Sequence, residues 1–148
     1  MSKVTESGAA HCPTDRFSRA LGLRQDRHAC ANLLHNRLDV NFYDDLAQFV
    51  GLSTKKLFSL LGVSLAVQRR WKKAQQLTIS ESDYAFRQAL VIQDALGLFE
   101  GNSEATVDWL KQPNIALGGA TPARLLSTFV GMNTVVSLIW KIENGVYQ

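Results

Sequence analysis

Short helical segments, each opened by a capping side chain, are the feature that most constrains the fold of this chain. Hydrophobic residues recur at spacings of three and four, as in amphipathic helices, and no long run alternates between apolar and polar residues. The three prolines, Pro13, Pro113 and Pro122, interrupt this pattern. We therefore expect an all-α protein built from packed short helices.

Caps and stops predict the individual helices. Asp15 opens a helix that runs to about Arg37, and "FYDDLAQFV" forms the next one. The last helix is expected over about 132–143, with Asn144-Gly145 as its stop. In between, the predicted N-caps are Ser53, Ser64, Ser80 or Ser82, Ser103 and Thr121, the last followed by Pro122 at the first helical position.

Length and composition narrow the class of protein. With 148 residues, 46% of them hydrophobic and 20% charged, the chain has the composition of a soluble globular protein. No run approaches the roughly 18 apolar residues of a membrane span. The start, "MSKVTESGAAHCPTD", lacks the apolar segment of a secretory signal. We expect a cytoplasmic protein without membrane contact, with Cys12 and Cys30 reduced.

Positive charge is concentrated in one segment. The net charge is only +3, yet residues 46–80 contain no Asp or Glu and carry six basic residues. The rest of the chain therefore sums to −3. Such a local basic patch on a nearly neutral chain indicates a binding site for a polyanion.

The basic segment has helix-turn-helix form, because two predicted helices are joined by "LGVS". Gly62 suits the sharp turn, and Ser64 caps a second helix that would enter the major groove of operator DNA. Arginine commonly reads guanine and glutamine can read adenine, so "QRR" suits base contact, with Leu65 and Ala66 beside it. The predicted DNA-contacting residues are Lys55, Lys56, Ser64, Gln68, Arg69, Arg70, Lys72 and Lys73.

One position departs from the usual helix-turn-helix pattern. An apolar residue usually stands six positions after the turn glycine, where this chain has Gln68. Val67 and Trp71, four apart on one helix face, are expected to supply the buried contact instead. That rotation would change which side chains face the groove. The alternative is a solvated basic face on a plain helix bundle, since such helix pairs also occur in proteins that bind no DNA.

Sites for metals or catalysis have little support in the sequence. His11, Cys12, His28, Cys30 and His35 lack the spacing of a zinc knuckle. The three histidines are confined to the first 35 residues, so no Ser/His/Asp or Cys/His set is indicated. We expect neither a metal nor a catalytic residue.

The C-terminal segment carries an ordered set of motifs. From Trp109 onward it reads helix, Pro-Asn break, Ala-Leu-Gly-Gly loop, Thr-Pro helix, glycine, and a helix that ends in Ile-Glu-x-Gly-Val-Tyr. This order resembles the toxin-binding domain shared by the Xre, MbcA and ParS group of bacterial antitoxins. The matching residues are Trp109, Leu110, Pro113, Asn114, Ala116 to Gly119, Thr121, Pro122, Leu125, Leu126, Gly131, Ile142, Glu143 and Gly145 to Tyr147.

Upstream, "LSTKKLFSLLGVS" and "QRRWKKAQQLTISESD" look like the Xre-type helix-turn-helix half of the same antitoxins. The resemblance covers roughly 41–148, whereas the first 40 residues match only loosely. It implies an antitoxin of a type II toxin–antitoxin pair, without enzymatic activity or cofactor. The implied partner is a RES-domain toxin that consumes NAD⁺. Members of this group typically form homodimers, repress their own operon, and cover the entrance of the toxin's active site.

The resemblance divides the chain into three parts. Residues 1–40 form a tail and helix that contact toxin, act as a dimer arm or extend the bundle. Residues 41–101 form the Xre-like DNA-binding region, and residues 102–148 the toxin-binding domain. The residues implied in toxin contact are Trp109, Pro113, Asn114, Leu117, Gly118, Gly119, Glu143, Gly145, Val146, Tyr147 and Gln148.

The ending "ENGVYQ" suggests how the toxin is blocked. Gly145 would set the angle of a short hook, and Tyr147 with the carboxylate of Gln148 would enter a concave, cationic pocket. The alternative is that Val146 and Tyr147 pack onto their own domain. Trp140 beside Leu138 and Ile139 gives the last helix apolar residues on more than one face, which predicts a second burial partner, either a dimer mate or the toxin.

Three functions fit these features. The first is an antitoxin that both binds DNA and inhibits a toxin. The second is a stand-alone helix-turn-helix regulator whose C-terminal half only dimerises. The third is a helical adaptor that has lost DNA binding, to which Gln68 lends weight.

Overall fold

The computed structural model describes residues 15–146, and this part of the chain confirms the predicted all-α fold. Its only strand-like feature among the described residues is an isolated bridge between Asp39 and Gln76. The elements in order are α2 (Asp15–Gly22), η1 (Leu23–Gln25), α3 (Arg27–His35), α4 (Phe42–Val50), α5 (Thr54–Leu61), α6 (Leu65–Ala74), α7 (Ile79–Leu98), α8 (Ser103–Lys111), η2 (Ile115–Leu117), α9 (Pro122–Leu125) and α10 (Phe129–Glu143).

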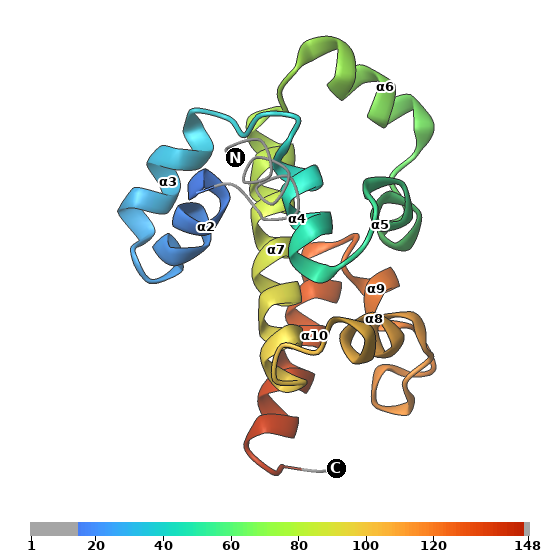
Figure 1. Cartoon of the computed structure of the whole chain (residues 1–148). Coiled ribbons are helices and arrows are strands. Elements are labelled where there is room, and N and C mark those ends of the chain that lie inside the picture. Colours follow the sequence, from blue (N-terminus) through green and yellow to red (C-terminus); the bar gives the residue numbers. More distant parts are fainter. Residues whose placement is uncertain (1–14, 147–148) are drawn as a thin grey trace, which may run out of the picture.

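The long helix α7 forms the axis of the molecule, and most other helices pack around it (Figure 1). Helices α2, α3, α4, α8 and α10 all contact it. Helix α6 stands away from this bundle at one end, and the C-terminal end of α10 lies at the opposite end (Figure 1). Helix α6 and the C-terminal end of α10 are therefore at opposite ends of the molecule.

One hydrophobic core runs through the whole described chain. Leu46, Leu57, Ile92, Leu110 and Leu126 are fully buried and belong to the same cluster. Their positions lie on both sides of residue 102, where the sequence predicts a domain boundary. The two predicted regions therefore share a core.

Gln88 on α7 links the two regions with hydrogen bonds at the centre of that core. Its side-chain Oε1 accepts from the Tyr43 hydroxyl of α4 at 2.7 Å, and its Nε2 donates to the carbonyl of Leu126 at 2.8 Å. A buried amide is tolerated because both ends are satisfied. This residue holds the helix-turn-helix half and the C-terminal half in a defined relation.

The described part of the N-terminal segment also joins this core. Phe17 of α2 packs on Phe42 and Phe49 of α4, with ring centroids 5.1 and 5.5 Å away. Arg24 of η1 forms a two-pronged ion pair with Asp94 of α7, at 2.8 and 3.1 Å. Residues 15–35 therefore extend the bundle.

Several predicted helix boundaries agree with the structure. Ser53, Ser64 and Thr121 are N-caps, and each side chain accepts a hydrogen bond from a backbone N–H of the following turn. Helix α4 has the predicted extent, and Asn144 caps the end of α10.

Other predicted boundaries were wrong. The single helix predicted over 15–37 is two helices, because η1 intervenes and the Asp26 side chain accepts from Ala29 N to start α3. Asn102, rather than Ser103, caps α8. Helix α10 begins at Phe129, before the predicted start near 132, because Thr128 caps it by accepting from Gly131 N.

The N-cap of α7 is Thr78, and neither Ser80 nor Ser82 serves this role. Thr78 and Glu81 form a reciprocal capping box, in which each side chain accepts from the backbone N–H of the other residue. The Ser82 hydroxyl is buried instead and accepts from the backbone of Leu38 at 2.8 Å. The reciprocal bonds with Glu81 thus distinguish Thr78 from Ser80 and Ser82 as the N-cap of α7.

Candidate functional site

Helices α5 and α6 form the predicted helix-turn-helix pair. Gly62 ends α5 in the left-handed conformation, with φ of 75°, which favours glycine at this turn. Ser64 then starts α6 by accepting a hydrogen bond from Val67 N. These local bonds explain why the segment "LGVS" turns the chain sharply between two helices.

Helix α6 is attached to the body through one large side chain. Trp71 is 4% exposed and stacks on Tyr43, with ring centroids 5.2 Å apart and an interplanar angle of 14°. Val67 is half-buried beside the core. The predicted use of Val67 and Trp71 as the buried contact is therefore confirmed.

Gln68, the departure from the usual pattern, has a structural role in the turn. Its Nε2 donates to the carbonyl of Val63 at 2.9 Å, so the amide closes the α5–α6 turn from within α6. The side chain is half-buried. Gln68 thus fits the turn without an apolar plug, and its amide is already engaged.

Glu81 at the start of α7 fixes the orientation of α6. It pairs with Arg70 and accepts from Trp71 Nε1 at 2.9 Å, while its capping bond ties it to Thr78. Partial burial raises the pKa of Glu81, but the bonds from Arg70, Thr78 and Trp71 outweigh burial and lower it to about 2. Arg70, predicted to read bases, is engaged within the fold by this pair.

A set of free cations remains on helices α5 and α6. They are exposed and form no ion pair within residues 15–146. Leu65, at the start of α6, is 64% exposed beside them. The free cations are Lys55, Lys56, Arg69, Lys72 and Lys73.

The "PNIALGG" loop of the C-terminal half is organised by Asn114. Its Oδ1 accepts from Ala116 N at 2.9 Å, and its backbone pairs with Ala120 and Gly119. The side chain of Ile115, which this loop presents, is 97% exposed. An apolar side chain held outward on an ordered loop is a contact candidate, and the sequence analysis missed it.

The predicted toxin-contacting residues fall into two groups. Trp109, Asn114 and Leu117 are half-buried. Trp109 and Leu117 pack against the core, and the ring centroids of Trp109 and Phe99 lie 6.1 Å apart. The packing of Trp109 and Leu117 indicates a structural role next to the "PNIALGG" loop. The described members that are exposed are Pro113, Gly118, Gly119, Glu143, Gly145 and Val146.

A Schellman motif closes the end of α10. Gly145 has φ of 67°, its N–H donates to Ile142, and the N–H of Val146 donates to the carbonyl of Lys141 at 2.8 Å. The direction of the chain is therefore defined as far as Val146, whose side chain is 38% exposed. Tyr147 and Gln148, the predicted point of the hook, lie outside the described residues.

The outer face of α10 is apolar, as its sequence predicts. Val136 and Trp140, four residues apart, are 39% and 57% exposed. Phe129 is 41% exposed, stacks on Tyr84 at 4.3 Å and lies under the Arg87 guanidinium at 5.0 Å. We name Phe129, Val136 and Trp140 the α10 face. Exposed apolar residues grouped on one helix face mark a candidate interaction surface.

Within residues 15–146 no three His, Cys, Asp or Glu side chains come together as a metal site. Cys30 donates its thiol to the carbonyl of Leu23, and burial raises the pKa of the thiol. His11 and Cys12 lie outside the described residues. No described helix has the length and apolarity needed to cross a bilayer.

Comparison with known proteins gives a consistent family assignment. The profile of the antitoxin Xre/MbcA/ParS C-terminal toxin-binding domain matches residues 95–145. The match begins within α7, before the boundary predicted at 102.

Three curated relatives share the description Antitoxin Xre. The protein from Photorhabdus laumondii is 28% identical over 77% of this chain and 78% of its own length. That from Yersinia enterocolitica is 28% identical over 74% of each chain. That from Pseudomonas putida is 32% identical over 53% of this chain and 49% of its own length. The matched domain and these relatives together support an antitoxin of the Xre/MbcA/ParS type, with the family match itself confined to residues 95–145.

Proposed function

We propose that this chain neutralises a RES-domain, NAD⁺-consuming toxin by covering its active site with the C-terminal region. The chain acts by binding, without catalysis. The main support for this proposal is the direction in which the chain leaves the C-terminal end of α10. The Schellman motif defines the direction of the backbone through Val146, and the Val146 side chain is 38% exposed, which supports its availability to a partner. A fixed exit lowers the ordering cost of inserting a short segment into a pocket.

Co-expression with the toxin encoded by the adjacent gene tests this proposal. The chain is expected to relieve the growth arrest caused by that toxin and to co-purify with it as a stable complex. Persistent growth arrest, with both proteins soluble, would instead favour the stand-alone regulator whose C-terminal half only dimerises.

The same chain is proposed to repress its own operon through α5 and α6. The five free cations lie on α5 and α6 in a segment, residues 46–80, that contains no Asp or Glu, and that charge distribution suits a DNA backbone. Because Gln68 and Arg70 have partners inside the fold, Arg69 is the best-placed base reader among the predicted residues.

Replacing Lys72 and Lys73 together with glutamine is expected to weaken binding to the promoter of the operon. Each phosphate contact releases counterions, so the slope of log affinity against log salt should become shallower by about 2 for the two lysines. Fluorescence anisotropy with labelled promoter DNA, measured over a salt series, gives this slope. Lys141→Gln, an exposed lysine on α10, is the matched control. An unchanged slope, or wild-type protein that binds no promoter DNA, would favour the adaptor that has lost DNA binding.

The α10 face is the proposed homodimer interface. Aromatic and arginine side chains are enriched in the centres of protein interfaces, and Phe129, Trp140 and Arg87 supply them here. Trp140→Glu is expected to convert a dimer into a monomer with unchanged helical content, because the new charge would be desolvated in the interface. Sedimentation velocity measures the change. A Trp140→Glu protein that sediments as the wild-type dimer would place the interface elsewhere.

A further inference from the structure

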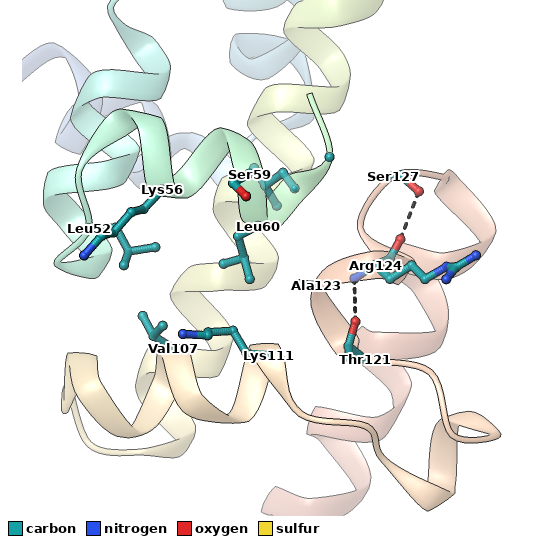
Figure 2. Close-up of a pocket in the computed structure, with 12 residues that line it drawn as sticks. Leu52, Lys56, Ser59, Leu60, Val107, Lys111, Thr121, Ala123, Arg124 and Ser127 are labelled. Atoms are coloured by element: carbon teal, nitrogen blue, oxygen red, sulfur yellow. Dashed lines mark hydrogen bonds between the residues drawn. The ribbon is translucent and has the colours of Figure 1, made fainter. Parts of the chain in front are cut away.

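A cleft between the two halves of the molecule shares only Lys56 with the predicted DNA-contacting residues, and its lining includes none of the described residues after Ser127. Its volume is about 730 Å³, and it lies between α5 on one side and α8 and α9 on the other. Figure 2 shows Leu60 of α5 projecting toward Val107 and Lys111 of α8 across this space. The cleft therefore combines the helix-turn-helix region with the matched toxin-binding domain.

The walls of the cleft are apolar, and its free charges are positive. Leu52, Leu60 and Val107 are half-buried and line it. Lys56 and Lys111 are exposed, and neither has an ion-pair partner in the described part of the chain. The described residues that line the cleft include no Asp or Glu.

The hydroxyl groups of the cleft differ in their availability. Thr121 accepts from Arg124 N at 3.2 Å, and Ser127 donates to the Arg124 carbonyl at 2.9 Å, so both hydroxyls stabilise α9 (Figure 2). The hydroxyl of Ser59, in contrast, has no hydrogen-bond partner among the described residues, and this residue is exposed on α5. The cleft thus offers the ammonium groups of Lys56 and Lys111, the guanidinium of Arg124 and one free hydroxyl beside its apolar walls.

These properties favour a protein segment over DNA as the occupant. Burial of the leucine and valine walls needs an apolar side chain, whereas a duplex would present charged phosphates to them. The two lysines then require a carboxylate at the edge of the same segment. We propose that the toxin inserts a segment with an apolar anchor and at least one carboxylate into this cleft.

This inference rests on the proposed function and extends it. The contact surface for the toxin would include Lys56, Ser59 and Leu60 of α5, outside the matched domain of residues 95–145. Continuity supports this, since α8 and α9 form one wall of the cleft and lie inside the matched domain. Toxin bound in this way would hold both halves of the chain at once.

The test measures the affinity of the full-length chain for the purified toxin of the adjacent gene, without DNA. The double variant Lys56→Glu/Lys111→Glu is expected to bind about 100-fold more weakly, because like charges would face the acidic segment. The control Lys55→Glu/Lys141→Glu makes the same charge change on α5 and α10 outside the cleft, and should bind within about threefold of wild type. Circular dichroism verifies folding of both variants.

A second variant tests the apolar part of the cleft. Ser59→Trp fills the space from an exposed helix position and should also weaken toxin binding, whereas Ser80→Trp on the exposed start of α7 should not. Cleft variants that bind toxin as wild type does would overturn this inference and leave the proposed function intact. Loss of promoter binding alone, with toxin affinity unchanged, would assign Lys56 to DNA and also overturn it. Wild-type protein that binds no toxin would refute the proposed function itself.

Discussion

Gly131→Ala is expected to lower the free energy of unfolding by about 3 kcal/mol, because the extra carbon has no room at the start of α10. An ideal Cβ at this position would lie 2.0 Å from the Leu125 carbonyl oxygen and 2.9 Å from Thr128 Oγ1. The first contact is with backbone, which cannot rotate away. The change would also displace the cap, since Thr128 Oγ1 accepts from Gly131 N at 2.9 Å.

Urea denaturation followed by circular dichroism measures this effect. Gly97→Ala is the matched control, because a Cβ there meets nothing within 4 Å and the residue lies in helix α7. The control is expected to be as stable as wild type or more stable, by up to about 1 kcal/mol. If Gly131→Ala unfolds at the wild-type urea concentration, the close packing of α9 against α10 is not as described.

Deletion of residues 146–148 is expected to abolish neutralisation and to weaken toxin binding about 100-fold, as loss of a central aromatic anchor does in other interfaces. The core should be unaffected, because Val146 is exposed and α10 already ends at Glu143. Growth rescue on co-expression and the dissociation constant of the complex are the two measurements.

Replacement of residues 146–148 by three serines separates side-chain from backbone effects. This variant keeps the backbone N–H that donates to Lys141 and so keeps the Schellman motif. It should fail to neutralise in the same way as the deletion. If the deletion variant folds and neutralises fully, the C-terminal segment is not the inhibitory element.

Local features of the fold were predictable because they depend on neighbours in sequence. Ser53 and Ser64 cap α5 and α6 through bonds to the next turn, and Gly62 and Gly145 adopt the left-handed conformation that the stop signals imply. These interactions span a few residues, so the sequence displays both partners together.

Features that depend on distant partners were not predictable. The choice of Thr78 over Ser82 as the cap of α7 depends in part on Leu38, whose N–H is bonded to the Ser82 hydroxyl. The sequence predicted a domain boundary at 102 but gave no sign of the link across it. That link is Gln88, which bonds to Tyr43 and Leu126 and joins the two halves. A buried glutamine looks like any other polar residue in the sequence of a helix.

The candidate surfaces divide in the same way. The sequence alone determined the basic helix-turn-helix segment and the family resemblance of the C-terminal half, because charge runs and ordered motifs are properties of the chain itself. Only the tertiary structure decided which side chains in these surfaces are available to a partner. Arg70 is paired with Glu81 and Trp109 is packed inward, whereas Ile115 is exposed. The physical reason is that exposure and pairing depend on which distant residues the core brings alongside each side chain.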